Sequence, residues 1–425
     1  MENRPVYIVG GMRTPFVRSM TSYSDVTMQD LMTASLNALV EKYGLADQII
    51  GDVAIGATIK NSLDWDFARE CVLGTKLHPY TPAYAVQRAC GSGLETTWQM
   101  ALKIAANQIE IGIAGGVDTN SDLPIVLNRS LTQKLLKINS AKSFADKAKI
   151  IASIRPGDFK FKAPSVAEPR TGLSMGEHCE KMVKEWEISR KEQDELAFIS
   201  HQNAAKAYEQ GFYNDLLFEF QGIKKDAFVR ADTTLEKLAK LKPSFDFSGQ
   251  GTLTAGNSTP LTDGSSAVLL VSEQELKKRN LTPMAKLVDA QVAAIDFVHG
   301  DGLLMAPTIA VAKLLYRHGL SLQEFDFYEI HEAFSGQVLC TLKAWESAEY
   351  CKRVLDRDLP LGSINRDKLN VKGGSVALGH PFAATGARIV AALSKMLYES
   401  KKHRGLISIC TAGGMGVAAI LEGLE

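Results

Sequence analysis

Cysteine and histidine residues that stand among small residues are the first candidates for chemistry in this sequence. Cys90 lies in the segment VQRACGSG (86–93), just before a helical pattern. A cysteine at the N-terminus of a helix feels the positive end of the helix dipole, which lowers the thiol pKa and favours the nucleophilic thiolate. Because a buried structural thiol fits this segment equally well, Cys90 alone does not establish an active site.

His380 lies between Gly379 and Pro381 in the segment KGGSVALGHP (372–381), and a helix is predicted to follow it. An imidazole held in a fixed turn can accept a proton from a thiol at neutral pH. For a lone histidine, a turn residue bonded to the backbone would be the simpler interpretation. The case for His380 therefore depends on its companions.

Two further candidates follow predicted strands. Cys410 opens the glycine-rich segment CTAGGMG (410–416), whose turn exposes backbone N–H groups of the kind that an oxyanion hole requires. A second thiol makes sense where one thiol is acylated while another moves a proton. His331 begins the segment HEAF (331–334), and strand ends are where α/β proteins place ligand groups. Taken alone, His331 fits a satisfied core histidine about as well.

These four side chains need a scaffold, and the hydrophobic pattern predicts an α/β fold with buried, largely parallel strands. Strands are predicted over residues 6–9, 52–59, 111–114, 285–293, 327–330 and 405–410. Helices are predicted over residues 31–43, 93–107, 308–318 and 386–401. The strand at 111–114 is expected to end at Gly115-Gly116, and the strand at 405–410 is interpreted as the last. The second half repeats the order of the first, which predicts two copies of one β/α unit.

The chain is therefore divided into three regions. Residues 1–122 together with 250–275 are predicted to form one core half, and residues 276–425 the other. Residues 123–249 are rich in lysine, glutamate and long polar helical patterns. A structureless loop of that length is implausible in a compact domain, so this region is predicted to be an inserted helical subdomain.

The first part of the insertion, Arg129 to Lys162, is strongly basic. It holds nine Lys or Arg against two Asp, interleaved with Leu, Ile and Phe. One interpretation is a solvated cap over the mouth of the active site. The alternative is a surface for a partner subunit or for an anionic membrane face.

The bulk composition is that of a soluble globular protein large enough for two or three domains. The 425 residues include 48 basic and 48 acidic ones, which cancel, so there is no electrostatic reason to expect nucleic acid as a partner. The N-terminus has no signal-peptide pattern. Six cysteines show no paired zinc or redox spacing, so we expect reduced thiols, a cytoplasmic location and no metal site.

Together the four segments resemble the motifs of the thiolase family, and the resemblance covers essentially the whole chain. The segments RTPF (13–16) and GTLTAGNS (251–258) fit it as well. The form of the motifs looks closest to the β-subunits of fatty-acid oxidation multienzyme complexes. Many other thiolases have Asn in place of both His331 and Ser375, and Ala412 replaces a glycine of the usual second-cysteine motif.

The resemblance implies a layered α-β-α-β-α fold and thiolytic cleavage of a 3-ketoacyl-CoA by CoA. Cys90 would be the acylated nucleophile, deprotonated by His380, and Cys410 would protonate the departing acetyl-CoA enolate and deprotonate CoA. His331 and His380 would meet the enolate oxygen, and the backbone N–H groups of Cys90 and Ala412 would meet the second oxyanion.

The family likeness also implies where CoA lies, which is on the inserted subdomain and as a substrate, with no further cofactor. The matching positions are Ser174, Met175, Arg230, Thr259, Ala333 and Phe334. Arg230 has its own rationale, because a guanidinium can pair with phosphate or stack on adenine. A surface salt bridge is the plainer interpretation of Arg230.

Thiolases form dimers or tetramers, so a homo-oligomer is expected, with an α-subunit carrying hydratase and dehydrogenase activity as a further partner. Three rival functions stay open. A biosynthetic acetoacetyl-CoA thiolase runs the same chemistry backwards. A ketoacyl synthase would lack the second cysteine, and an inactive acyl-CoA-binding relative would not need all three reactive side chains.

Overall fold

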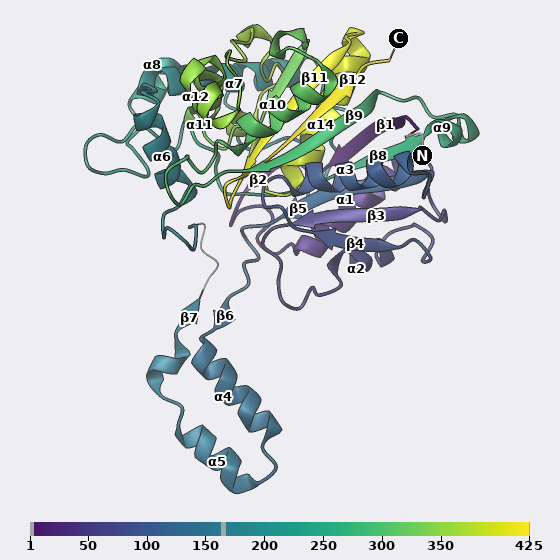
Figure 1. Cartoon of the computed structure of the whole chain (residues 1–425). Helices are drawn as coiled ribbons and strands as arrows, with labels where there is room; N and C mark the ends of the chain where they lie inside the picture. The colour runs from purple at the N-terminus through teal and green to yellow at the C-terminus, as the bar shows by residue number, and fades with distance from the viewer. Residues whose placement is uncertain (1–3, 163–166, 425) are drawn as a thin grey trace.

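The computed structural model describes residues 4–162 and 167–424, and its centre is one mixed sheet of ten strands (Figure 1). Nine strands follow the order β10-β11-β12-β9-β1-β8-β5-β3-β4, and the short β2 pairs with β8. The strands of this sheet are β1 (Val6–Arg13), β2 (Val17–Arg18), β3 (Asp52–Ala57), β4 (Ala83–Val86), β5 (Ile111–Asp118), β8 (Thr262–Ser272), β9 (Ala285–Ala294), β10 (Phe327–Ile330), β11 (Arg404–Thr411) and β12 (Met415–Glu422).

The strand order confirms that one unit occurs twice. In the N-terminal half the order is β3-β5-β8-β1, and in the C-terminal half it is β10-β11-β12-β9. Of the four strands named in each half, the second, third, fourth and first in chain order therefore lie side by side in the same sequence. The two halves join through a short antiparallel pairing of β1 with β9. The α/β class is confirmed, but the expectation of largely parallel strands is wrong. Only β3 with β4, β3 with β5 and β10 with β11 are parallel among the paired strands described.

Helices complete five layers, as the resemblance implied. One apolar core lies between α1 and the N-terminal half of the sheet, and another lies between α10 and the C-terminal half. The largest core surrounds the central helices α3 and α14. The helices of the two halves are α1 (Met28–Lys42), α2 (Phe67–Leu73), α3 (Ser92–Ala105), α9 (Glu273–Arg279), α10 (Ala306–His318), α11 (Ser335–Glu346), α12 (Ala348–Val354), α13 (Ser375–Leu378) and α14 (Ala384–Ser400).

The two central helices approach closely at their N-termini because glycines face each other there. A Cβ on Gly93 of α3 would lie 2.4 Å from the carbonyl oxygen of Ala383, and a Cβ on Gly386 of α14 would lie 2.1 Å from the backbone nitrogen of Leu94. Neither position has room for a side chain. This crossing brings the turn before α3, which carries Cys90, against the turn before α14, which carries His380.

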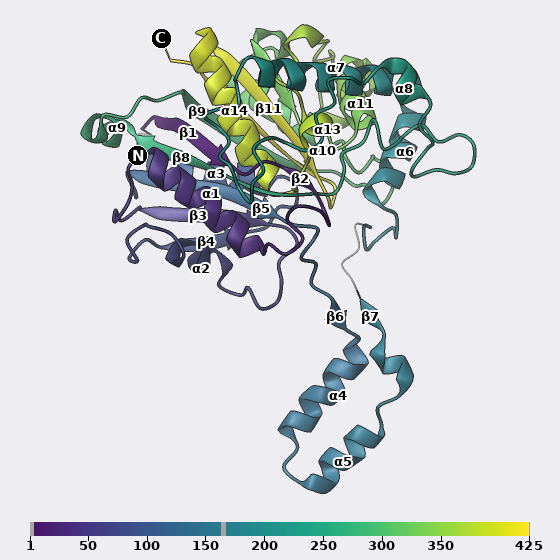
Figure 2. The ribbon, with the colours of Figure 1, turned by 180° about the vertical axis from the view of Figure 1, so that it is seen from behind.

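The inserted region consists of two different parts. Its later helices, α6 (Met175–Glu185), α7 (Arg190–Glu209) and α8 (Leu235–Ala239), lie over the C-terminal half in both views (Figures 1 and 2). Both α6 and α7 begin with a capping box in which a serine and the glutamate three residues later satisfy each other's backbone N–H.

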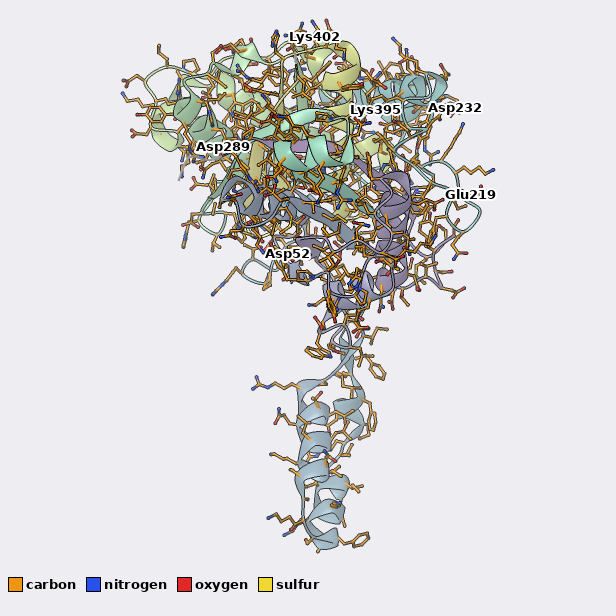
Figure 3. The ribbon with its side chains drawn as sticks, turned by 90° about the vertical axis from the view of Figure 1, so that its right-hand side faces the viewer. Asp52, Glu219, Asp232, Asp289, Lys395 and Lys402 are labelled. Atoms are coloured by element: carbon orange, nitrogen blue, oxygen red, sulfur yellow. The ribbon has the colours of Figure 1, made fainter. Side chains whose placement is uncertain are left out.

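The basic part of the insertion forms a projecting arm. It contains β6 (Val126–Leu127), α4 (Arg129–Ser140), α5 (Phe144–Ala152) and β7 (Phe161–Lys162), and β6 pairs with β7 at its base. The arm extends away from the body in all three whole-chain views (Figures 1 to 3). The interpretation of Arg129 to Lys162 as a cap over the active-site mouth is therefore wrong.

Two predicted strand boundaries also need correction. Strand β5 runs on through Gly115 and Gly116 to Asp118, and at these glycines the backbone of β8 and of the turn before α14 comes close. The strand at 404–411 is not the last, since β12 follows it across the Gly-Gly turn as an antiparallel partner. Within the described residues no helix is both long enough and apolar enough to cross a bilayer.

Candidate active site

Cys90 lies in a tight turn between β4 and α3. The preceding residue, Ala89, has a positive φ of 43°, an unusual conformation for a residue with a side chain. The hydroxyl of Ser92 accepts a hydrogen bond from the N–H of Arg88 and donates one to the carbonyl of Ala89, both at 2.7 Å. These bonds hold the strained turn, and with it the direction of the Cys90 side chain.

His380 is held by two buried hydroxyls. The backbone N–H of His380 donates to Oγ1 of Thr262 at 3.1 Å. Its ring atom Nδ1 shares a hydrogen bond of 2.6 Å with Oγ1 of Thr385. The Nε2 atom has no hydrogen-bond partner among the described residues, although it is buried. When Nδ1 donates its proton to Thr385, Nε2 presents a free lone pair that can act as a base.

His331 follows β10 and is fixed through Ser375. Its Nδ1 and the Ser375 hydroxyl lie 2.9 Å apart, and the buried Arg388 donates to the same hydroxyl oxygen at 3.0 Å. Because Arg388 donates to the Ser375 oxygen, the hydroxyl hydrogen of Ser375 is available to His331 Nδ1. This arrangement favours the tautomer that carries its proton on Nε2, so His331 faces the site as a donor.

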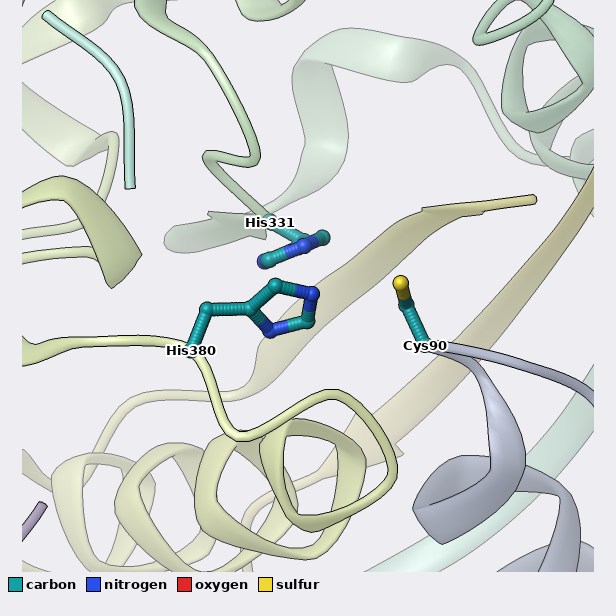
Figure 4. Close-up of side chains that lie close together, drawn as sticks. All are labelled: Cys90, His331 and His380. Carbon is teal, nitrogen blue, oxygen red and sulfur yellow. The ribbon is translucent and has the colours of Figure 1, made fainter. Parts of the chain in front are cut away.

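These three side chains meet although they are far apart in the sequence. The ring centroids of His331 and His380 lie 4.1 Å apart, and Figure 4 shows the two rings beside the Cys90 sulfur. The sulfur and one nitrogen of each ring all lie within 4.8 Å of one another. The structure thus brings together a thiol, a base and a hydrogen-bond donor.

Cys410 and Ala412 reach the same place from β11. The N–H of Ala412 donates to the Cys90 sulfur. Cys410 is buried in an apolar cluster with Ala333 and Phe334. Burial and the nearby Cys90 sulfur raise the pKa of the Cys410 thiol well above its usual range. The second thiol therefore lies within electrostatic reach of the first.

The expected low pKa of Cys90 is wrong for this structure. Burial, together with the charge of Asp118, raises the pKa of the Cys90 thiol to about 12. The N–H groups of Ala412 and Cys90 act in the opposite direction and are outweighed. Burial also lowers the pKa of His380 to about 3. The resting site at neutral pH is accordingly a neutral thiol beside a neutral imidazole.

Alkylation of Cys90 without substrate should therefore be slow at pH 7 and rise with pH. Because the thiolate is the reactive form and its pKa lies far above neutrality, the rate should grow about tenfold per pH unit between pH 7 and 10. Mass spectrometry of the iodoacetamide-modified peptide that contains Cys90 measures this rate. A fast rate that stays flat across this range would mean a thiolate already formed at pH 7.

Two buried carboxylates near the site were missed by the sequence analysis. Asp118, at the end of β5, accepts hydrogen bonds from the N–H groups of Thr58, Ile59 and Ala383 at 2.8 to 2.9 Å. It thereby ties the His380 turn to the N-terminal half. Burial raises the pKa of Asp118 to about 6. The predicted strand stopped before Gly115, so only the observed end of β5 points to Asp118 as a residue of the site.

The second carboxylate belongs to Glu168 of the inserted region. It accepts the N–H of Gly413 at 2.7 Å, so it fixes the glycine-rich turn beside Cys410. Nothing in the sequence around Glu168 indicated this contact. The turn that follows Glu168 leads directly into Ser174 and α6, which connects the insertion to the reactive centre.

Four of the six expected CoA contacts lie beside the reactive centre. Thr259 donates to the carbonyl of Ala333 through both its N–H and its hydroxyl, at 3.1 Å each. Phe334 pairs with the neighbouring Ser258, and Met175 packs on the apolar cluster that holds Ala333, Phe334 and Cys410. The Ser174 hydroxyl is engaged in capping α6 through Glu177.

Arg230 lies apart from these residues, on an exposed cleft of about 500 Å³. The cleft is lined by Arg18 and Lys237 as further cations, by Asp232, and by Ser258 and Pro260, which flank Thr259. It thus leads from a cationic surface to the residues that border the reactive centre. Arg18 and Lys237 were not among the expected contacts, although Arg18 closely follows the RTPF segment.

Comparisons with known proteins agree with this geometry. Residues 6–274 match the model of the thiolase N-terminal domain, and residues 281–423 match that of the thiolase C-terminal domain. A 3-ketoacyl-CoA thiolase of Pectobacterium carotovorum subsp. carotovorum (strain PC1) is 40% identical over 423 residues, covering 98% of this chain and 96% of that protein. One of Yersinia pestis (strain Pestoides F) is 39% identical with the same coverage.

Solved structures give the same result. The acetyl-CoA acetyltransferase of Bacillus anthracis superposes with a TM-score of 0.82 at 30% identity, over 100% of both chains. Human mitochondrial 3-ketoacyl-CoA thiolase, crystallised in complex with CoA, superposes with a TM-score of 0.82 at 29% identity, over 99% of this chain and 98% of that one. With both family domains matched along nearly its whole length, the chain belongs to the thiolase family.

Proposed function

We propose that the protein cleaves 3-ketoacyl-CoA with CoA, giving acetyl-CoA and an acyl-CoA shortened by two carbons, as in fatty-acid β-oxidation. The observation that carries this proposal is the cluster of Cys90, His331 and His380, with Cys410 and the Ala412 N–H beside it. Such a site offers a nucleophile, a base, a second proton carrier and two kinds of oxyanion donor.

In the first half-reaction His380 Nε2 takes the proton of Cys90 as the sulfur attacks the 3-keto carbon. The tetrahedral oxyanion lies against the N–H groups of Cys90 and Ala412. Collapse of the intermediate breaks the bond between C2 and C3 and leaves the acyl group on Cys90. The electron pair goes to the acetyl-CoA enolate, and Cys410 supplies the proton that converts it to acetyl-CoA.

In the second half-reaction the roles of Cys410 reverse. Its thiolate takes the proton of incoming CoA, and the CoA sulfur attacks the acyl group on Cys90. Release of the shortened acyl-CoA returns Cys90 as a thiolate, which recovers its proton from His380. The Nε2–H of His331 donates to the enolate oxygen in the first step, which is the role that the Ser375 contact prepares it for.

A series of 3-ketoacyl-CoA substrates of increasing chain length tests this function. We expect CoA-dependent loss of the 3-ketoacyl-CoA and equal amounts of acetyl-CoA and shortened acyl-CoA. A protein that acts only on acetoacetyl-CoA and favours condensation would instead be a biosynthetic thiolase. The presence of Cys410 in the site argues against a ketoacyl synthase. An inactive binding protein would form no labile adduct on Cys90 with acyl-CoA.

Arg230→Ala should weaken CoA binding while leaving chemistry intact. Loss of one charge-assisted contact to a phosphate corresponds to about 1.5 to 3 kcal/mol, so KM for CoA should rise about 10- to 150-fold with kcat nearly unchanged. Initial rates at varied CoA concentration measure the effect. Arg230→Lys should restore part of the affinity. An unchanged KM in Arg230→Ala would leave the surface salt bridge as the better interpretation.

We also propose that the arm of residues 126–162 contacts an anionic membrane surface. Its large apolar side chains lack a core of their own, since Leu131 is the single buried residue of α4 and none is buried in α5. Phe144 is 87% exposed and Phe161 is 65% exposed. Figure 3 shows that the arm stands clear of the body of the protein. Apolar side chains mixed with an excess of lysine suit the interface of a charged bilayer.

Vesicle binding tests this role of the arm. The intact protein should float with vesicles containing anionic lipid, and more weakly as salt increases. Replacing Lys137, Lys142, Lys147 and Lys149 by glutamine should reduce binding by about 1 kcal/mol for each lysine. The matched control replaces four exposed lysines of the body. Binding that is indifferent to the arm lysines, or binding only to a copurified subunit, would overturn the membrane role.

We further propose that the protein is a cytoplasmic homo-oligomer that associates with a hydratase and dehydrogenase α-subunit. The terminal position of β4 in the sheet supports self-association, because an unpaired strand edge can pair with a second copy. Leu63 and Trp65, in the segment between β3 and α2, are each 84% exposed. Sedimentation velocity measures the oligomeric state, and copurification identifies the partner.

A further inference from the structure

Cys90, His331 and His380 have the composition and the geometry of a metal-binding site. The sulfur and one nitrogen from each ring lie within 4.8 Å of one another. Tetrahedral zinc with nitrogen and sulfur ligands would require separations of about 3.3 to 3.6 Å between them. Donor atoms that lie farther apart than this have to approach one another as the metal binds.

The nitrogen atoms that face this cluster are free to bind. Both Nδ1 atoms are engaged, one with Ser375 and the other with Thr385. Both Nε2 atoms are buried and have no hydrogen-bond partner among the described residues. His331 and His380 are 1% and 3% exposed. Two buried, unsatisfied imidazole nitrogens beside a thiol are a donor set that borderline-soft cations prefer.

The surroundings of the cluster also resemble those of bound zinc. A zinc-ligating histidine usually donates its second ring N–H to a carboxylate, a backbone carbonyl or a water, which orients the ring. Here hydroxyl oxygens take that place: Ser375, supported by Arg388, contacts His331, and Thr385 contacts His380. The orientation that serves proton transfer thus also prepares both rings as ligands.

We propose that Cys90, His331 and His380 form an inhibitory binding site for Zn²⁺. The thiol gives its proton to solvent as the bond between sulfur and metal forms, and each ring binds through Nε2. For His331 this requires the other tautomer, in which the ring proton moves from Nε2 to Nδ1 and Nδ1 donates to the Ser375 hydroxyl oxygen. A coordinated thiol is deprotonated outright by the cation, so the neutral resting site does not prevent binding. Metal binding does not rest on the proposed thiolysis. Inhibition does, because the metal occupies the nucleophile and the base at once.

Titration of the intact protein with Zn²⁺ and with Co²⁺ tests the site directly. CoA is left out because its free thiol would itself bind the metal. We expect one high-affinity equivalent by calorimetry, and a near-ultraviolet band from thiolate to Co²⁺. In Cys90→Ala the band should disappear and the affinity should fall at least about 100-fold. His331→Ala and His380→Ala should each weaken binding about 10- to 100-fold.

Two control variants separate this site from other cysteines and histidines. Cys71→Ala removes a buried thiol outside the cluster, and His299→Ala breaks the exposed pair with Asp296. Both should bind Zn²⁺ like the intact protein. Cys90→Ser, checked for an unchanged melting temperature, keeps the test valid if the alanine variant folds poorly. Unchanged affinity in the Cys90 variants, or loss of binding in a control variant, would overturn the proposal.

A separate measurement addresses inhibition. Zn²⁺ should abolish acylation of Cys90 by acyl-CoA, a chelator should restore it, and protein already acylated should bind the metal at least about 100-fold more weakly. Full acylation in the presence of bound Zn²⁺ would refute an inhibitory role. A protein that binds the metal but cleaves no 3-ketoacyl-CoA would refute only the proposed function.

Discussion

Replacing Cys90 by alanine is expected to lower kcat for thiolysis by about 10⁵-fold or more, because the covalent route is lost with the nucleophile. No acyl adduct should form with any acyl-CoA. Cys90→Ser should fail in the same way, since a hydroxyl beside a neutral imidazole is a far weaker nucleophile than a thiol. Steady-state rates and intact-protein mass spectrometry measure the two effects.

Cys71→Ala is the matched control for this experiment. Cys71 is buried in the core on the α1 side, away from the cluster of Cys90. Its replacement should change stability modestly and leave kcat within about twofold, as expected for a residue that touches no substrate. Turnover in Cys90→Ala within a hundredfold of that of the control would rule out Cys90 as the nucleophile.

Replacing Cys410 by alanine is expected to separate the two half-reactions. Acyl-CoA should still acylate Cys90, because CoA leaves readily as a thiolate without a proton. Cleavage of 3-ketoacyl-CoA should fall by about 10²- to 10⁴-fold, because the departing enolate carbon loses its proton donor. Mass spectrometry of the trapped acyl-enzyme measures the first half-reaction. The steady-state rate of thiolysis measures the two half-reactions together.

The contrast between the two cysteine variants is the stronger test. An adduct in Cys410→Ala and none in Cys90→Ala would assign nucleophile and proton carrier without ambiguity. Equal residual turnover in the two variants would contradict both roles. An adduct on residue 410 would mean that Cys410 is the nucleophile. Cys410→Ser serves as a second variant, because its smaller change in volume limits damage to the apolar cluster around Ala333 and Phe334.

The class of fold and the repeated unit could be predicted from the hydrophobic pattern, and β10 was predicted to the residue. The direction of the strands could not. The two strands that make the sheet mixed, β8 and β12, were not among the predicted strands, and both are antiparallel to their neighbours. A strand buried on both faces also has the same hydrophobic pattern in either direction. The arm was predicted to be helical and basic. Its projection could not be predicted, because the sequence pattern does not tell whether such a segment packs on the body.

The reactive residues could be predicted because each lies in a glycine-rich or strand-end segment. Their electrostatics could not, because the dipole at the start of α3 favours a thiolate while burial opposes it, and only the structure gives the burial. The roles of Ser375, Arg388 and Glu168 depend on contacts between distant segments. The metal-binding geometry was invisible for the same reason, since its three donors have no zinc-like spacing in the sequence.

The crossing of α3 and α14 has a consequence for how this chemistry is divided between the repeats. The two helices start from the corresponding loops of the duplicated units. Cys90 and its proton acceptor, His380, therefore occupy equivalent positions in the two units. The N-terminal unit supplies Cys90, and the C-terminal unit supplies His380. A fragment that contains one unit alone would therefore lack either the nucleophile or its base. The reactive pair exists only where the two units contact each other.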